Sequence, residues 1–125
     1  MIISVTLYPY PTFYSLSVNL LFVCSECRLR SPTAEAVFSE YDGLEALAAG
    51  TNHDAETPLT GDLIEWADLI LVMESTHRNK INKKFGALLR GKRLVLLNIP
   101  DKYHYMQAEL VQLLKARVEK HLSNL

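Results

Sequence analysis

The chain has very few cysteines: its 125 residues include two, Cys24 and Cys27, which stand close together. So small and local a set excludes the disulfide framework of a secreted domain and favours a reducing, cytoplasmic location. Long hydrophobic runs are also lacking, since none approaches the roughly 20 residues that a membrane-spanning helix needs. Charge of one sign is not in excess, because thirteen basic and fourteen acidic residues give a net charge of -1. That balance argues against general binding of nucleic acid.

What the chain does have is the composition of one globular domain, with 49% hydrophobic and 22% charged residues. We assign this domain to residues 19–125 and treat residues 1–18 as an appendage. The appendage lacks a basic start, and two prolines interrupt its apolar stretch, so it is not expected to be a signal peptide. Ile3, Val5 and Leu7 alternate with other residues, which predicts an added edge strand unless the start codon was chosen too early.

From residue 20 onward, short apolar runs alternate with segments of helical period. The runs cover residues 20–23, 44–49, 68–72 and 93–99. This alternation is typical of an α/β domain whose parallel strands are joined by crossover helices. Ser31 is expected to cap the first helix, and Ser75 or Thr76 the third. Right-handed crossovers would place ligand chemistry at the carboxyl ends of the strands.

The segment C-S-E-C-R-L-R-S-P at residues 24–32 lies between the first strand and the first helix. Five residues between Cys24 and Arg30 let the backbone curl into a cup whose N–H groups converge on an anion. Arg30 would grip two phosphate oxygens with its planar guanidinium. The positive potential of these N–H groups and of Arg30 would favour the thiolate form of Cys24, which is the nucleophile. Ser31 would donate a hydrogen bond to its sulfur. The residues expected around the phosphate are Ser25, Glu26, Cys27, Arg28, Leu29, Arg30 and Ser31.

Asp101 follows the fourth apolar run in the segment I-P-D-K-Y. The topology would bring it to the same edge as Cys24, where it would protonate a leaving oxygen as general acid. A turn-forming role after proline is the alternative. Tyr103 and Tyr105 would either wall a pocket for an aromatic leaving group or lie on the surface.

A basic run extends from Arg78 to Arg93, with seven Lys and Arg residues and no acidic one. Such a run is most often a solvated helix face. It can also attract phosphorylated or acidic partners locally, although the whole chain is slightly acidic.

The spacing of Cys24 and Cys27 also allows a dithiol site of the thioredoxin kind. Such a site has no use for Arg30, and the order of elements lacks the antiparallel strand pair of that fold. Cys27 could instead protect Cys24 by forming a disulfide with it. The four histidines show no paired spacing, so we expect neither a metal nor another cofactor.

These motifs resemble the low-molecular-weight protein tyrosine phosphatases, particularly their short bacterial members, over residues 20–122. The matching segments are L-F-V-C at 21–24, R-S-P-T-A-E-A at 30–36, A-G-T at 49–51, A-D-L-I-L-V-M-E at 67–74 and I-P-D-K-Y at 99–103. The resemblance implies a three-layer α/β sandwich with a four-stranded parallel sheet of order 2-1-3-4 and flavodoxin-like topology. It implies hydrolysis of phosphotyrosine through a phosphocysteine, with Cys24, Arg30 and Asp101 as nucleophile, phosphate clamp and general acid.

Three departures from the family pattern lie near the cup. Glu26 and Cys27 stand where the family has Gly-Asn, Ala48 stands where it has Ser, and Lys102 replaces the Pro of Asp-Pro-Tyr. These departures motivate a second hypothesis, in which the chain is a phosphate-binding or regulatory protein that is impaired in catalysis. The expected partner is a phosphorylated protein or a small aryl phosphate, bound by a monomer, with no nucleic acid and no membrane.

Overall fold

The structure is a computed structural model that describes residues 17–123. The alternation at residues 3–7 lies outside these residues, and the boundary between an appendage and a domain stays a prediction. The strands are β2 (Val18–Cys24), β3 (Leu44–Gly50), β4 (Leu69–Val72) and β5 (Arg93–Leu96). The helices are α1 (Arg30–Phe38), α2 (Gly61–Trp66), α3 (Ser75–Phe85) with the 3-10 turn η2 (Gly86–Leu89), and α4 (Ala108–Leu122). None of the helices in the described range is long and apolar enough to cross a membrane.

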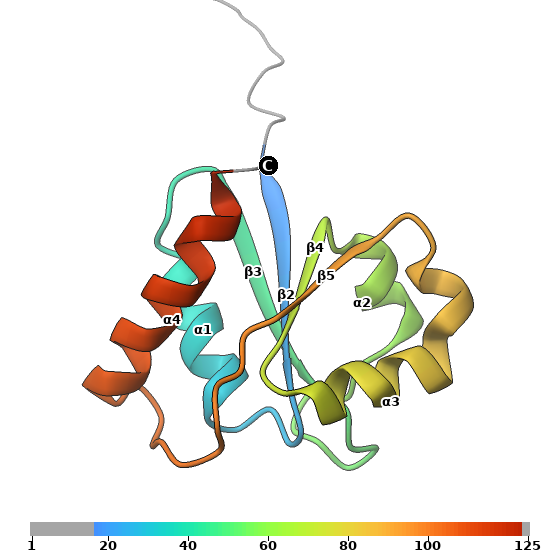
Figure 1. The fold of residues 1–125 in the computed structure, drawn as a ribbon, viewed down its shortest axis with the longest axis horizontal. Coiled ribbons are helices and arrows are strands. Elements are labelled where there is room, and N and C mark those ends of the chain that lie inside the picture. The colour runs from blue at the N-terminus through green and yellow to red at the C-terminus, as the bar shows by residue number, and fades with distance from the viewer. Residues whose placement is uncertain (1–16, 124–125) are drawn as a thin grey trace, which may run out of the picture.

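The four strands form one parallel sheet in the order β3-β2-β4-β5. Counted along the described chain this is 2-1-3-4, so the expected fold class and strand order are confirmed. In the register, Cys24 lies opposite Gly50, and Val23 lies opposite Val72. The strands therefore end level with one another, and the loops that follow them gather at the lower edge of the sheet in Figure 1.

Helices cover both faces of the sheet, with α1 and α4 on one side and α2 and α3 on the other (Figure 1). The central strand β2 serves both layers: Leu20 and Phe22 pack with α1 and α4, whereas Leu21 and Val23 pack toward α2 and α3. All four side chains are fully buried. Each contributes about 1.5–3 kcal/mol of hydrophobic stabilisation. This two-sided burial explains why β2 is a continuous apolar run with no polar alternation.

The start of α1 differs from the expected cap. The helix begins at Arg30 with Leu29 in the N-cap position, and no side chain caps it. Ser31 lies inside the first turn, and its hydroxyl contacts Cys24 Sγ at 3.0 Å. The prediction that Ser31 caps α1 was wrong, because its hydroxyl contacts the Cys24 sulfur and not the backbone at the start of the helix.

The start of α3 also differs. Glu74, not Ser75 or Thr76, is the N-cap, and it forms a capping box with His77. The side chain of Glu74 accepts from the His77 backbone, and the His77 side chain accepts from the Glu74 backbone. This reciprocal pair satisfies two helix-start donors, which a lone hydroxyl cannot do.

The fourth strand is shorter than expected, because the regular pairing of β5 ends at Leu96. Asn98 takes a left-handed conformation with φ 57° and interrupts the pleat. The chain nevertheless stays against β4, since Leu97 and Ile99 donate to the carbonyls of Val72 and Met73, each at 2.9 Å. This continuation carries the following residues, including Asp101, to the edge where the cup lies.

Candidate active site

The loop after β2 directs its carbonyl groups outward. Three of them accept hydrogen bonds from the loop that follows β3: Cys24 from Thr51 (2.9 Å), Ser25 from Asn52 (3.0 Å) and Glu26 from Glu56 (3.0 Å). In a trans peptide, a carbonyl and the next N–H point in opposite directions. The N–H groups of residues 25–27 therefore face the inner side of the loop.

One contact shows where these N–H groups converge. The backbone N–H of Cys27 donates to Cys24 Sγ at 3.3 Å. The Leu29 carbonyl accepts from Thr33 at 3.1 Å, so the next N–H points out of the N-terminus of α1. Within residues 17–123, the N–H groups of Ser25, Glu26, Arg28 and Leu29 donate to no acceptor of the protein. A set of free donors beside a sulfur is a site for an anion.

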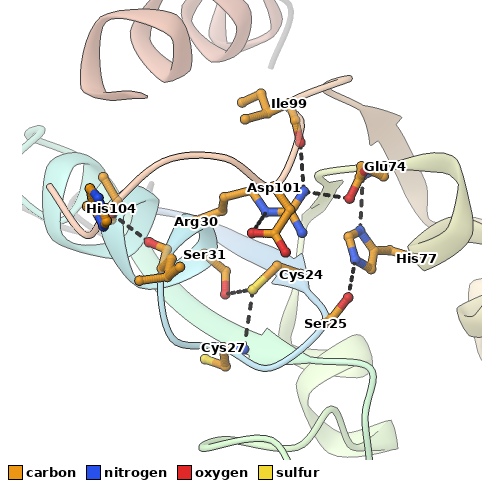
Figure 2. Close-up of polar contacts among 12 residues, drawn as sticks. Cys24, Ser25, Cys27, Arg30, Ser31, Glu74, His77, Ile99, Asp101 and His104 are labelled. Carbon is orange, nitrogen blue, oxygen red and sulfur yellow. Dashed lines mark hydrogen bonds and ion pairs between the residues drawn. The ribbon is translucent and has the colours of Figure 1, made fainter. Parts of the chain in front are cut away.

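Cys27 occupies the position where the loop turns most sharply. Its φ of 58° lies in the left-handed region, which costs a side chain other than Gly or Asn roughly 1–2 kcal/mol. Its side chain points away from Cys24 (Figure 2) and packs with Ala48 and Ala55. Two departures from the family pattern, Cys27 and Ala48, are thus neighbours in one apolar cluster.

Burial in that cluster raises the pKa of the Cys27 thiol, and the nearby Cys24 adds to the rise. Less of the thiol is then ionised at neutral pH, and thiolate is the form that exchanges with an oxidised sulfur. Both cysteines are free. The Cys24–Cys27 disulfide stays a prediction, one that neither the direction of the Cys27 side chain nor its ionisation favours.

Gly50, at the end of β3, lets the second loop approach the cup. A Cβ at this position would lie 2.5 Å from the Ser25 carbonyl oxygen and 2.6 Å from Cβ of Ala55. Any larger residue would push the two loops apart. The outward hydrogen bonds that orient the cup depend on this close contact.

The sulfur of Cys24 lies at the bottom of the cup, and the residue is 4% exposed. The Ser31 hydroxyl lies 3.0 Å from the sulfur and 3.3 Å from the Ala49 carbonyl oxygen. Its single proton can go to either acceptor, and a negatively charged sulfur is the stronger one. The Ser31 hydroxyl is therefore placed to donate to the Cys24 sulfur, and this role stays a prediction.

Arg30 comes from the first turn of α1 and is 3% exposed. Its Nη1 atom lies 2.6 Å from Glu74 Oε1 and 2.7 Å from the Ile99 carbonyl oxygen, which uses both Nη1 protons (Figure 2). Its Nε atom lies 3.8 Å from Asp101 Oδ1. The edge formed by Nε and Nη2 can therefore present two parallel donors to an oxyanion.

His77 supports the cup from α3. Its Nδ1 accepts from the Glu74 backbone at 3.0 Å, so the neutral ring carries its proton on Nε2. Nε2 lies 2.9 Å from Ser25 Oγ and donates to it. Burial, with the positive charge of Arg30, lowers the pKa of His77 to about 4, so the ring is neutral at pH 7. Ser25 is then left with its own proton to donate.

The sequence interpretation assigned no role to Glu74 or His77. The signal that was available is the spacing E-x-x-H at the start of a helix, which allows a reciprocal capping pair. The link from this pair to Arg30 and Ser25 cannot be seen in the sequence, since it joins segments more than 40 residues apart.

A cavity of about 390 Å³ opens above the sulfur, and Cys24, Arg30 and Asp101 all line it. Its other lining residues are Ser25, Glu26, Arg28, Leu29, Asn52 and Lys80. The end of β2, the start of α1 and the segment after β5 thus meet at one cavity, as the topology predicted. Glu26 stands at the rim and pairs with Arg28 at 3.5 Å, which offsets part of its charge. In the described part of the chain, no group of three His, Cys, Asp or Glu residues is suited to hold a metal ion.

The sequence left two positions open for the tyrosines, as pocket walls or on the surface. Neither lines the cavity above Cys24. Tyr103 packs against the core between the sheet and α1 and α4, whereas Tyr105 is exposed and lines a separate hollow that also includes Cys27. The reason is that Met106 donates to Thr33 Oγ1 at 2.9 Å, which draws this segment across α1.

Comparisons with known proteins agree with this arrangement, although no protein-family model matches the chain. The protein-arginine-phosphatase of Bacillus subtilis strain 168 is 33% identical over a region covering 55% of this chain and 64% of that protein, less than two thirds of its length. A solved YwlE arginine phosphatase, a Cys-to-Ser mutant with a phosphorylated active-site serine, is 26% identical with a TM-score of 0.65. That match covers 85% of this chain and 96% of that one.

A third similar structure is the tyrosine phosphatase Wzb from Escherichia coli K30, in complex with phosphate. It is 24% identical with a TM-score of 0.69, covers 86% of this chain and 97% of that one, and shows the shared fold. The four-stranded sheet with a cysteine loop at its carboxyl edge is thus a fold that this chain shares with small α/β phosphatases. In sequence and fold, the chain is similar to proteins of the low-molecular-weight protein tyrosine phosphatase family.

Proposed function

We propose that this chain is a phosphatase that removes phosphate from a protein side chain through a phosphocysteine on Cys24. The observation that carries the proposal is that Cys24, Arg30 and Asp101 line one cavity around a loop with inward N–H groups. The phosphorylated serine that replaces an active-site cysteine in the YwlE mutant supports the same position for the nucleophile.

In the first step, the Cys24 thiolate attacks phosphorus, and the bond from phosphorus to the leaving atom breaks. The loop N–H groups and the Nε–Nη2 edge of Arg30 hold the equatorial oxygens as charge redistributes over them. Protonated Asp101 gives its proton to the leaving atom and becomes a carboxylate. In the second step this carboxylate takes a proton from water, and the water oxygen attacks the phosphocysteine. Phosphate leaves, and the thiolate is restored.

Phosphotyrosine is the substrate that the sequence resemblance favours. A second candidate, phosphoarginine, is favoured by the lining of the cavity, which contains no aromatic side chain and two carboxylates, Glu26 and Asp101. A guanidinium carries delocalised positive charge and binds carboxylates well. Hydrolysis of one peptide carrying either phosphotyrosine or phosphoarginine separates the two candidates by their kcat/KM.

The proposal is tested with para-nitrophenyl phosphate. Cys24→Ser should abolish turnover, whereas Cys27→Ser, which changes the other cysteine, should retain it. Asp101→Asn should lower kcat by about 10²–10⁴-fold, the usual contribution of a general acid. Equal rates for wild type and Cys24→Ser would overturn the proposal. Tight phosphate binding by wild type, with no hydrolysis of either phosphopeptide or of the aryl phosphate, would support the binding or regulatory hypothesis instead.

A further inference from the structure

A second hollow of about 550 Å³ lies beside the active-site cavity, between α3 and the loop that follows β3. Its apolar floor consists of Leu59, Ile81 and Phe85, and its rim carries Lys80, Lys83 and Lys84. Ile81 is 1% exposed and Leu59 is 8% exposed, so the floor belongs to the core of the domain. The three lysines are exposed.

The hollow adjoins the active-site cavity. Asn52 and Lys80 line both cavities, and Lys80 Nζ donates to Asn52 Oδ1 at 3.4 Å. These two residues mark one side on which a substrate with its phosphate in the cup above Cys24 can extend beyond the active-site cavity. On that side, the next part of the substrate would lie in the hollow.

The charge of the hollow has one sign. Its lining residues include three lysines and no carboxylate. Within residues 17–123, none of these lysines forms an ion pair. The Lys84 ammonium lies 5.4 Å from the centre of the Phe85 ring, so a basic and an apolar group lie next to each other in the hollow. The active-site cavity differs, because Glu26 and Asp101 offset part of its positive charge.

We propose that this hollow binds an acidic segment of the protein substrate, next to the phosphorylated residue. The proposal rests on the proposed function, since it places the phosphate in the cup. Lys80 and Lys84 stand about 6 Å apart along the helix axis. An extended peptide advances about 3.3 Å per residue, so it crosses this span in about two residues. Acidic side chains that pair with Lys80 and Lys84 would therefore be about two residues apart, on one side of the phosphorylated residue, with an apolar residue among them.

The experiment uses phosphopeptides with three Asp on the N-terminal side, three Asp on the C-terminal side, or three Gln on both sides. The phosphorylated residue is whichever of phosphotyrosine and phosphoarginine the wild type hydrolyses faster. One acidic peptide should exceed the neutral one in kcat/KM. The double variant Lys83→Gln, Lys84→Gln should lose about three- to tenfold on that peptide, as expected for two exposed ion pairs. Its kcat/KM for para-nitrophenyl phosphate should stay unchanged, because neither lysine lines the cavity above Cys24.

The matched control is Lys115→Gln, Lys120→Gln, which makes the same change in net charge on α4, on the other face of the sheet (Figure 1). It should keep the full preference for the acidic peptide. Acidic peptides no better than the neutral one, or a preference that survives in the Lys83, Lys84 variant, would overturn the inference. An oligonucleotide that binds more tightly than the acidic peptide and is lost in the same variant would overturn the choice of a protein partner.

Binding measured with Cys24→Ser separates the two proposals. If this variant binds the acidic phosphopeptide by fluorescence anisotropy, and the Lys83 and Lys84 substitutions weaken that binding, the hollow is confirmed even where wild type shows no turnover. If wild type hydrolyses the aryl phosphate while charge next to the phosphorylated residue has no effect, the proposed function stands and the hollow has no role in recognition.

Discussion

Arg30 and Glu74 form an ion pair with Nη1 and Oε1 2.6 Å apart, across 44 residues of sequence. Glu74 is at the same time the N-cap of α3. The direction of the guanidinium that faces the cup is therefore set by the start of a helix on the opposite face of the sheet. A substitution at this helix start should therefore alter the binding of phosphate, because it changes the orientation of Arg30.

Glu74→Gln should weaken phosphate binding although it leaves the cavity lining intact. The neutral amide keeps an acceptor but loses a charge-assisted hydrogen bond, which contributes about 1.5–3 kcal/mol. We expect kcat/KM for para-nitrophenyl phosphate to fall about tenfold to a hundredfold, with weaker competitive inhibition by inorganic phosphate. Glu45→Gln, an exposed change on β3, is the control and should leave both values unchanged. Unaltered phosphate inhibition in Glu74→Gln would show that Arg30 is oriented without this pair.

Gly50→Ala should separate the two loops around the cup. The added Cβ would lie 2.5 Å from the Ser25 carbonyl oxygen, a backbone atom that cannot move without shifting the loop. Overpacking of this kind costs about 1–3 kcal/mol, and we expect kcat to fall at least about tenfold as the N–H groups lose their alignment. Gly86→Ala is the matched control, since nothing lies within 4 Å of its Cβ. Full activity of Gly50→Ala, at a denaturation midpoint equal to that of wild type, would contradict the role of the close contact.

His77 should make the fold less stable in weak acid. Its pKa falls from the usual 6.5 in the unfolded chain to about 4 in the folded one. Between these values the unfolded state binds more protons, so stability is lost as the pH drops through this window. The loss attributable to this side chain is at most about 3 kcal/mol. Urea denaturation at pH 7 and pH 4.5 checks this prediction, with His77→Asn as the comparison because Asn can still accept from the Glu74 backbone. A wild type that loses no more stability than the variant would contradict it.

The effects of Cys27→Asn and Ala48→Ser on the stability of the protein should depend on each other. Asn is well suited to the left-handed backbone at position 27, but the side chain would enter a cluster formed with Ala48 and Ala55. A buried amide without partners costs about 1–3 kcal/mol, so the single substitution should destabilise the protein. Adding Ala48→Ser supplies a hydroxyl next to it and should recover about 1 kcal/mol or more. Stability of the four proteins in this double-mutant cycle is the measurement, and strictly additive effects would rule out a shared network at this position.

The family pattern also allows a gain of activity to be tested in the same proteins. If a hydrogen bond between side chains at positions 27 and 48 makes the loop after Cys24 more rigid, Cys27→Asn with Ala48→Ser should raise kcat for the aryl phosphate relative to either single variant. A double variant that is more stable but no faster would show that the apolar cluster already holds the loop well enough for chemistry.

Much of the fold could be predicted from the chain itself. The apolar runs that became β2 and β4 are buried on both faces, which is why they appear as continuous hydrophobic segments. The order of strands and helices then left few topologies, and Cys24, Arg30 and Asp101 were expected at one edge because parallel strands end together. The helix starts were less predictable. Ser31 and Glu74 are used by the site, and local capping preferences carry no information about a partner 44 residues away.

The sequence by itself determined the α/β class, the parallel sheet and the segment that forms the cup, because hydrophobic periodicity and a short loop before a helix are local properties, whereas the strand order was implied by the family resemblance. Only the tertiary structure decided that Glu74 holds Arg30, that His77 supports Ser25, and that Tyr105 lies away from the cavity. These are contacts between side chains from separate elements. These contacts depend on which strands end level in the sheet and on a few ångströms of packing, as at Gly50. The spacing of residues along the chain predicts neither of the two.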